Sequence, residues 1–123
     1  MEHWFEKSVV GGLPERAARR FADLPGLIFQ DRSYTFAEMA REVDIAARAL
    51  MALGVKRGDN VSLWLNNCDD WVFIMYALAK IGAVLVPINT RFRTNDLEYV
   101  LRQRDNRCAP RYFCIAARVW ATR

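Results

Sequence analysis

Residues 60–89 read NVSLWLNNCDDWVFIMYALAKIGAVLVPIN and decide the fold of this chain. Residues 61–65 and 83–86 are short apolar runs, which is typical of parallel strands covered on both faces. Between them, a predicted helix presents apolar side chains at helical spacing, namely Trp71, Ile74, Met75, Leu78 and Ile81, and Gly82 can end this helix. Strand, helix and strand in this order predict a right-handed crossover unit. The predicted fold class is therefore α/β, with a partial layered sheet built from parallel strand-helix-strand units.

A second helix is predicted directly upstream of this unit. Thr35 followed by Glu38 is a capping box, in which each side chain accepts a hydrogen bond from the backbone amide of the other residue. Gly54 can take the left-handed conformation that ends the helix, so that Val55 folds back on Leu50. The predicted buried face of this helix consists of Phe36, Met39, Ala40, Val43, Ala47 and Leu50.

Weaker signals place short elements at both ends of this core. Pro14 stands at a first helical position and predicts a short helix that stops before residues 25–26. Residues 27–30 and 33–35 have the composition of two short strands joined by a turn. Thr94 begins a final predicted helix.

The charge pattern divides the chain into a neutral body and a basic tail. Residues 1–103 hold thirteen Lys or Arg and thirteen Asp or Glu, whereas residues 104–123 hold five Arg and one Asp. A nucleic-acid-binding surface would spread its basic residues over the folded body, so no nucleic-acid partner is predicted. Two interpretations of residues 105–123 stay open, a frame-shifted or disordered end and a strand over 111–116.

Cysteine use and hydropathy bear on the compartment. The three cysteines Cys68, Cys108 and Cys114 have no metal-ligand spacing, and their odd number favours a reducing compartment. Residues 1–7 carry charges where a secretory signal needs an apolar run. Residues 71–88 are apolar except for Lys80, which would cost about 3 kcal/mol at a bilayer centre. We therefore predict no membrane span and a cytoplasmic location.

Four ordered motifs carry a family resemblance. The first is Tyr34-Thr35-Phe36-Ala37-Glu38, and the second runs from Ala49 to Val61 and includes Leu53-Gly54-Val55 and Gly58-Asp59. The third is Trp71, and the fourth runs from Lys80 to Asn89 and includes Gly82-Ala83-Val84 and Pro87. In this order and spacing the set resembles the N-terminal portion of the AMP-binding, acyl-adenylate-forming enzymes of the acyl-CoA synthetase or fatty-acid–CoA ligase type. The resemblance assigns residues 12–104 to the first part of their large N-terminal domain and leaves residues 105–123 as the basic tail.

The resemblance implies an activity that these residues do not complete. Such enzymes activate a carboxylic or fatty acid with ATP and Mg2+ to an acyl-adenylate, and then transfer the acyl group to coenzyme A. Their phosphate-binding loop, adenine-contacting segment and carboxy-terminal lysine correspond to positions beyond Arg123. We expect a truncated fragment that is inactive alone, with no catalytic residue, no metal ligand and no bound cofactor.

The alternative interpretation is a small non-catalytic α/β module that binds a protein partner. Apolar strand faces and edges that the chain cannot cover with its own helices also predict self-association or aggregation.

Arg91 is the candidate cofactor-binding residue. It follows a predicted strand and precedes a predicted helix, where anions are favoured. In some relatives this loop approaches the coenzyme A nucleotide, so the resemblance implies a phosphate contact for Arg91. The simpler interpretation of Arg91 and Arg93 is that they are two solvated loop arginines.

Other reactive or aromatic residues have simpler interpretations. His3 is expected to be a solvated terminal residue and Cys68 an inert loop cysteine. Asp69 or Asp70 can cap the helix that follows. Trp64, Trp71 and Phe73 could form an acyl pocket, but their spacing favours a place in the core.

Overall fold

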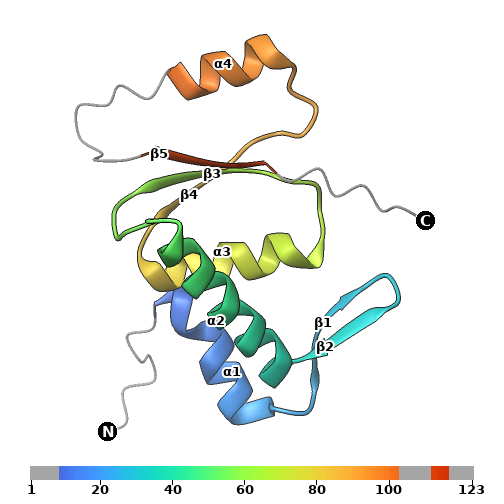
Figure 1. Ribbon diagram of the computed structural model, residues 1–123. Helices are drawn as coiled ribbons and strands as arrows, with labels where there is room; N and C mark the ends of the chain where they lie inside the picture. The colour runs from blue at the N-terminus through green and yellow to red at the C-terminus, as the bar shows by residue number, and fades with distance from the viewer. Residues whose placement is uncertain (1–8, 103–111, 117–123) are drawn as a thin grey trace, which may run out of the picture.

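The computed structural model describes residues 9–102 and 112–116 (Figure 1). Its elements in chain order are η1 (Val10–Gly12), α1 (Leu13–Phe21), β1 (Pro25–Phe29), β2 (Arg32–Thr35), α2 (Phe36–Ala52), β3 (Asn60–Trp64), α3 (Asp69–Ile81), β4 (Val84–Pro87), α4 (Thr94–Arg102) and β5 (Tyr112–Ala116). The helices and strands predicted from the sequence are present, with ends shifted by one or two residues. The α/β fold class is confirmed.

Strand β3 is the centre of a parallel sheet with the order β4-β3-β5. Val61 of β3 lies opposite Leu85 of β4 on one side and Phe113 of β5 on the other. We expected β4 to be an inner strand, but within the described residues it lies at the edge, and Val84 is 47% exposed. Pro87 suits an edge strand because proline has no amide hydrogen to donate to a further strand.

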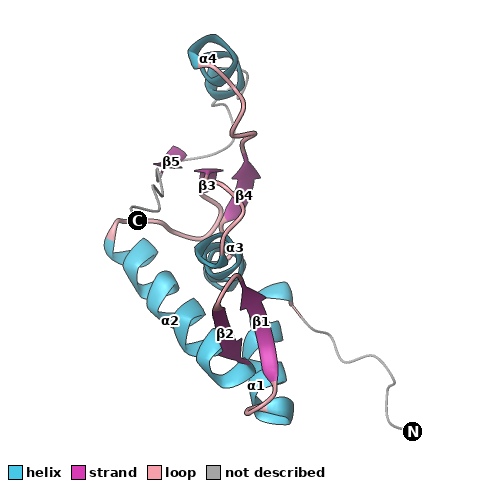
Figure 2. Cartoon of the chain, turned by 90° about the vertical axis from the view of Figure 1, so that its right-hand side faces the viewer, coloured by secondary structure: helices cyan, strands magenta, loops and turns pink. Residues whose placement is uncertain are grey.

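Helices lie on both sides of this sheet, but among the described residues only α3 packs closely on it (Figures 1 and 2). Helix α3 lies against one face, and α4 lies on the opposite side in both views. Helix α2 packs against both α3 and α1, while β1 and β2 form a separate antiparallel hairpin near the start of α2. The parallel strand-helix-strand arrangement is thus as predicted, with a second helical layer beneath α3.

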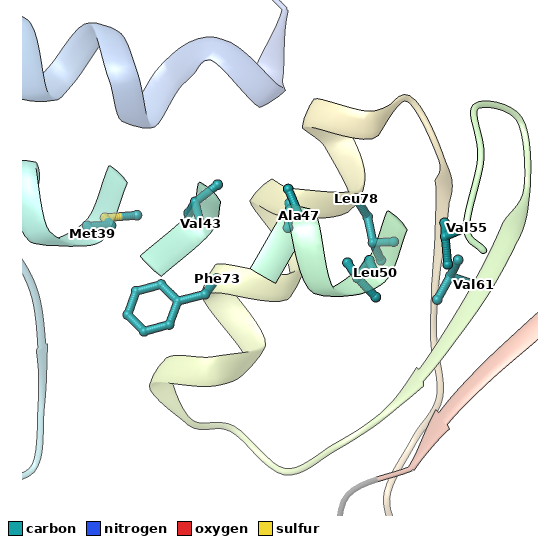
Figure 3. Packing of buried hydrophobic residues seen from close by; sticks show 9 residues of the cluster. Met39, Val43, Ala47, Leu50, Val55, Val61, Phe73 and Leu78 are labelled. Carbon is teal, nitrogen blue, oxygen red and sulfur yellow. The ribbon is translucent and has the colours of Figure 1, made fainter. Parts of the chain in front are cut away.

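The core lies mainly between α2, α3 and β3 (Figure 3). Leu78 of α3 is completely buried and points toward Leu50 of α2, while Val55 and Val61 close the end of the cluster. The buried residues of the cluster are Met39, Val43, Ala47, Leu50, Val55, Val61, Phe73, Ala77 and Leu78. The predicted face of α2 is confirmed at Met39, Val43, Ala47 and Leu50.

The buried face of α3 is rotated from the predicted one. Of its residues only Asp69, Phe73, Ala77 and Leu78 are buried, whereas the prediction named Trp71, Ile74, Met75, Leu78 and Ile81. Helix α3 packs against both α2 and the sheet, so residues around most of its circumference are half-buried. Hydrophobic periodicity is therefore a weak guide to which of its sides is the innermost.

Local signals set the limits of α2. Thr35 N–H donates to Glu38 Oε2 at 2.8 Å, and Glu38 N–H donates to Thr35 Oγ1 at 3.2 Å, which confirms the capping box. These bonds from Thr35 hold the pKa of Glu38 below its ordinary value. At the other end Gly54 has φ = 96°, and Val55 N–H donates to the Leu50 carbonyl at 3.1 Å. The helix therefore ends in the left-handed motif that the sequence predicts.

Helix α3 ends in the same way. Gly82 has φ = 83°, and Ala83 N–H donates to the Leu78 carbonyl at 3.0 Å. The turn before β3 then meets this end, because Gly58 N–H donates to the Gly82 carbonyl at 2.9 Å. The turns that lead into β3 and β4 are thus joined by a backbone hydrogen bond.

Lys80 links three helices on one side of the molecule. Its ammonium group on α3 forms ion pairs with Asp44 of α2 and Glu15 of α1. Hydrogen bonds to Asp44 and Glu15 raise the pKa of Lys80 above its ordinary value.

Across residues 9–102 and 112–116, each helix is too short or too polar to cross a bilayer.

Segment η1 approaches α3 very closely. Gly11 is buried, and a Cβ added there would lie 2.5 Å from Lys80 Cα and 2.6 Å from the Ala79 carbonyl carbon. The neighbouring Gly12 has only Val9 Cγ2 nearby, at 3.8 Å from such an added Cβ. Because Gly11 has no side chain, the backbones of η1 and α3 can touch at this position.

The basic tail contains a strand. Of the two interpretations of residues 105–123, the strand is present as Tyr112–Ala116, where Ile115 lies opposite Leu63 of β3. The strand interpretation also predicts an entry loop over residues 105–110, which lies outside the described residues. A frame-shifted origin of the tail stays a prediction.

Candidate functional site

A polar hollow lies at the carboxyl ends of β3 and β4. It has a volume of about 470 Å³ and is lined by Leu65, Asn66, Asn67, Trp71, Pro87, Ile88, Asn89 and Thr90. Because β3 and β4 are parallel, the loops that follow them come together at this edge of the sheet, where α/β proteins commonly bind ligands. Carboxamide groups from both loops and the hydroxyl group of Thr90 give the hollow hydrogen-bond donors and acceptors.

The loop after β4 is held by local hydrogen bonds. Ile88 N–H donates to the Leu63 carbonyl at 3.0 Å, which keeps this loop aligned with β3. Asn89 Oδ1 accepts from Arg91 N–H at 3.0 Å, and the Asn89 carbonyl accepts from Phe92 N–H at 3.1 Å. The backbone at Arg91 is thus fixed by the same asparagine that lines the polar hollow.

The two candidate arginines lie just beyond that wall. Arg91 and Arg93 are both exposed, and neither is among the residues that line the polar hollow. Arg91 directly follows Thr90, which does line it, whereas Arg93 N–H donates to Asp96 Oδ2 at 3.2 Å at the start of α4. Of the two, Arg91 is closer in sequence to the residues that line the polar hollow.

A smaller apolar hollow adjoins the polar one. It has a volume of about 230 Å³ and is lined by Leu27, Phe29, Asn67, Cys68, Asp69, Trp71 and Val72. Asn67 and Trp71 therefore belong to the walls of both hollows.

The aromatic candidates separate into two environments. Phe73 is 4% exposed and belongs to the core, as predicted. Trp71 is half-buried on the walls of the two hollows, so its expected place in the core is wrong. Trp64 is half-buried at the end of β3.

Asp69 has a role that the sequence interpretation missed. Cys68 occupies the N-cap position of α3 without a side-chain cap, so neither Asp69 nor Asp70 caps the helix. Asp69 is 1% exposed; its Oδ2 accepts from the Tyr34 hydroxyl at 2.6 Å and its Oδ1 from Arg32 Nη2 at 2.9 Å. The carboxylate thus joins the start of α3 to strand β2, and we call Arg32, Tyr34 and Asp69 the Asp69 cluster.

Cys68 is half-buried and its thiol is free. Cys68, Asp69 and Asp70 bring one possible metal-ligand atom each within 4.8 Å of one another. Both Asp69 oxygens already accept hydrogen bonds, which favours a structural role for this group over metal binding. His3 lies outside the described residues.

The Asp69 cluster predicts an alkaline titration. The hydrogen bond to Asp69, with burial and the nearby negative charge, raises the pKa of Tyr34 above 10.0. Since the folded state keeps this proton longer than the unfolded state, the stabilisation is present below pH 10 and is lost as pH rises through the folded pKa. The difference in near-ultraviolet absorbance between the wild type and Tyr34→Phe isolates this ionisation. We expect Asp69→Asn to shift it to lower pH, and an unshifted midpoint would contradict the assignment.

Similarity to known proteins covers most of the described residues. The family model "AMP-binding enzyme" matches residues 14–109. The mouse mitochondrial medium-chain acyl-CoA ligase ACSF2 is 36% identical over 98 residues, which cover 78% of this chain and 16% of the relative. The chain therefore spans less than a fifth of the length of the curated relatives it matches.

Solved structures show the same relationship. A Mycobacterium tuberculosis fatty acyl CoA synthetase has a TM-score of 0.72 and 32% identity, with 76% of this chain and 19% of that chain covered. The Klebsiella oxytoca NpsA N-terminal subdomain in complex with anthranilyl-AMSN has a TM-score of 0.74 and 30% identity, covering 79% of this chain and 26% of its own. Together with the family match over residues 14–109, these likenesses show that the chain belongs to the AMP-binding enzyme family and has the fold of part of the N-terminal domain of adenylate-forming enzymes.

Proposed function

We propose that this chain is the first part of an acid–CoA ligase that activates a carboxylic acid with ATP and Mg2+ and transfers the acyl group to coenzyme A. The family match and the relatives named as acyl-CoA ligases support this proposal. We assign residues 12–104 to the AMP-binding domain and residues 105–123 to the tail. The small-molecule acid, the nucleotide and coenzyme A are then ligands of the longer protein, which we place in the cytoplasm; of these, coenzyme A is the one that we expect to bind at the polar hollow of this chain.

Within that protein we propose that Arg91 contacts a phosphate of coenzyme A. The observation that supports this role is that Arg91 directly follows Asn89 and Thr90, which line the polar hollow, and that its backbone N–H is held by Asn89 Oδ1. The residues present fit a phosphate-bearing group, because a guanidinium can donate two parallel hydrogen bonds to phosphate oxygens. Asn66, Asn67 and Thr90 would donate to neutral or anionic oxygens from the walls. Coenzyme A itself would supply the thiol that accepts the acyl group.

Arg91→Ala is expected to weaken coenzyme A binding by about tenfold to a hundredfold, since a hydrogen bond to a charged group contributes about 1.5–3 kcal/mol. Chemical-shift titration of the 123-residue chain with coenzyme A measures the effect. Arg48→Ala is the matched control, because Arg48 is also exposed but lies on α2. Equal affinities for the wild type and Arg91→Ala would reject the contact.

We further propose that these 123 residues do not form an acyl-adenylate by themselves. Activation needs backbone amides and hydroxyl groups arranged around a triphosphate. The six glycines are at positions 11, 12, 26, 54, 58 and 82, and those with positive φ, Gly54, Gly58 and Gly82, lie in helix ends and the turn before β3. Pyrophosphate exchange by the purified chain with ATP, Mg2+ and fatty acids should stay at the buffer level, and acid-dependent exchange would overturn this proposal.

A second candidate function is binding of a protein partner, including a further copy of this chain. The α2–α3 groove, lined by Glu42, Ile45, Ala46, Leu65, Asp70, Phe73 and Ile74, supports it, because Ile45 is 58% exposed beside apolar neighbours. Sedimentation of the wild type and Ile45→Glu at increasing concentration tests self-association. A monomeric wild type at all concentrations would argue against it.

A further inference from the structure

The Asp69 cluster joins two parts of the chain that the sequence separates widely. Arg32 and Tyr34 lie on β2, whereas Asp69 begins α3, and 35 residues separate Tyr34 from Asp69. The Tyr34 ring also packs edge-on against Phe73 of α3, with ring centroids 5.2 Å apart. The hairpin is thus fixed to the first turns of α3 by one buried carboxylate and one aromatic contact.

Asp69 also ends the loop that forms a wall of the polar hollow. Asn66 and Asn67 line that hollow, and only Cys68 separates them from Asp69. The apolar hollow is lined by Leu27 and Phe29 of β1 together with residues of this loop and of α3. A change at the Asp69 cluster therefore acts on the loop from its carboxyl end, while β3 holds its amino end.

The two asparagines have few other constraints among the described contacts. Both are exposed, and they follow β3 after the buried Leu65, without a helical or strand hydrogen-bond pattern of their own. On the other loop that lines the hollow, Asn89 accepts two hydrogen bonds within its own turn, and Thr90 follows it. The relative position of the two walls thus depends on how the loop after β3 is anchored.

We infer that Asp69 is a positioning residue, which through Tyr34 and Arg32 holds Asn66 and Asn67 at the spacing from Asn89 and Thr90 that the ligand of the polar hollow needs. The identity of that ligand, the phosphate-bearing end of coenzyme A, rests on the proposed function. The positioning itself does not, because it is a property of the unliganded chain.

The first test measures the loop without ligand. Nitrogen-15 relaxation gives backbone order parameters for Asn66 and Asn67, and for Val61 and Leu63 in β3 as internal references. We expect a rigid wild-type loop, with order parameters near ~0.85, and values below ~0.6 in Asp69→Asn, with β3 unchanged. Asp70→Asn is the matched control, since Asp70 is the exposed neighbour on the same helical turn.

Tyr34→Phe keeps the test valid if Asp69→Asn loses its fold. It removes one of the two donors to Asp69 and keeps the aromatic contact with Phe73. We expect a smaller fall in the order parameters of the same two loop residues. A wild-type loop that is already mobile, or loop values in Tyr34→Phe equal to those in the wild type, would overturn the inference.

The second test adds coenzyme A to the same variants. We expect Asp69→Asn to raise the dissociation constant about tenfold and Asp70→Asn to leave it within about twofold. If no variant and no wild type binds coenzyme A, the ligand assignment fails while the order parameters still decide the positioning role. If the loop is mobile in Asp69→Asn but this variant binds coenzyme A as tightly as the wild type does, Asp69 does not position the loop for binding.

Discussion

Leu78→Ala is expected to lower the free energy of unfolding by about 2–5 kcal/mol. Leu78 is completely buried, and it packs between α2 and the sheet in the centre of the core. Truncation removes contacts with neighbours that cannot all move inward, so a cavity adds to the lost burial of apolar surface. Because folded domains are stable by only about 5–15 kcal/mol, this single change can unfold the chain before denaturant is added.

Urea titration followed by far-ultraviolet circular dichroism measures this effect. Ile45→Ala is the matched control, since Ile45 lies on α2 but is 58% exposed, and its effect should be within about 0.5 kcal/mol. A midpoint for Leu78→Ala equal to that of Ile45→Ala would show that the chain in solution does not have this core.

Gly11→Ala should destabilise the chain by about 1–3 kcal/mol. The added methyl group would lie 2.5–2.6 Å from backbone atoms of Lys80 and Ala79, far inside normal contact distance. Neither side can give way by rotating a side chain, so η1 must move away from α3. Such a movement would also displace α1, which begins immediately after Gly12 and carries Glu15, a partner of Lys80.

The adjacent glycine supplies the control. In Gly12→Ala the new methyl group has only Val9 Cγ2 nearby, at 3.8 Å, so we expect a change of about 0.5 kcal/mol or less. Thermal unfolding of both variants should therefore give a clearly lower midpoint for Gly11→Ala. Equal midpoints would mean that η1 does not pack on α3 in solution.

Signals of short range made much of the fold predictable. The capping box at Thr35 and the glycine at position 54 define both ends of α2, and the bonds at both ends are present. Gly82 ends α3 in the same way. These features depend on residues within one helical turn of one another, which is why the sequence alone contains them.

Features that depend on distant residues were not predictable in this way. The sequence makes Asp69 or Asp70 a candidate helix cap, because nothing near Asp69 in the sequence reveals that Arg32 and Tyr34 are its partners. The prediction of which side of α3 is innermost was also wrong, since an almost entirely apolar helix has a poorly defined apolar face. The edge position of β4 depends on strand order, which hydrophobic patterns do not encode.

The candidate site was predictable only in outline. The sequence places Arg91 just after a strand, and in the structure that strand ends at the polar hollow, but a contact of Arg91 with coenzyme A stays a proposal. Asn66, Asn67, Asn89 and Thr90 were not singled out, although polar residues at the carboxyl ends of two successive parallel strands are a usable signal. Trp71 was assigned to the core because spacing alone does not separate a core residue from the wall of a hollow.

The order β4-β3-β5 has a consequence for synthesis on the ribosome. The central strand is made first and its two neighbours follow, so each new strand meets a template that already exists. Residues 13–81 also contain α1, α2 and α3, which pack on one another. A nascent chain can therefore pack these three helices together before β4 and β5 have left the exit tunnel.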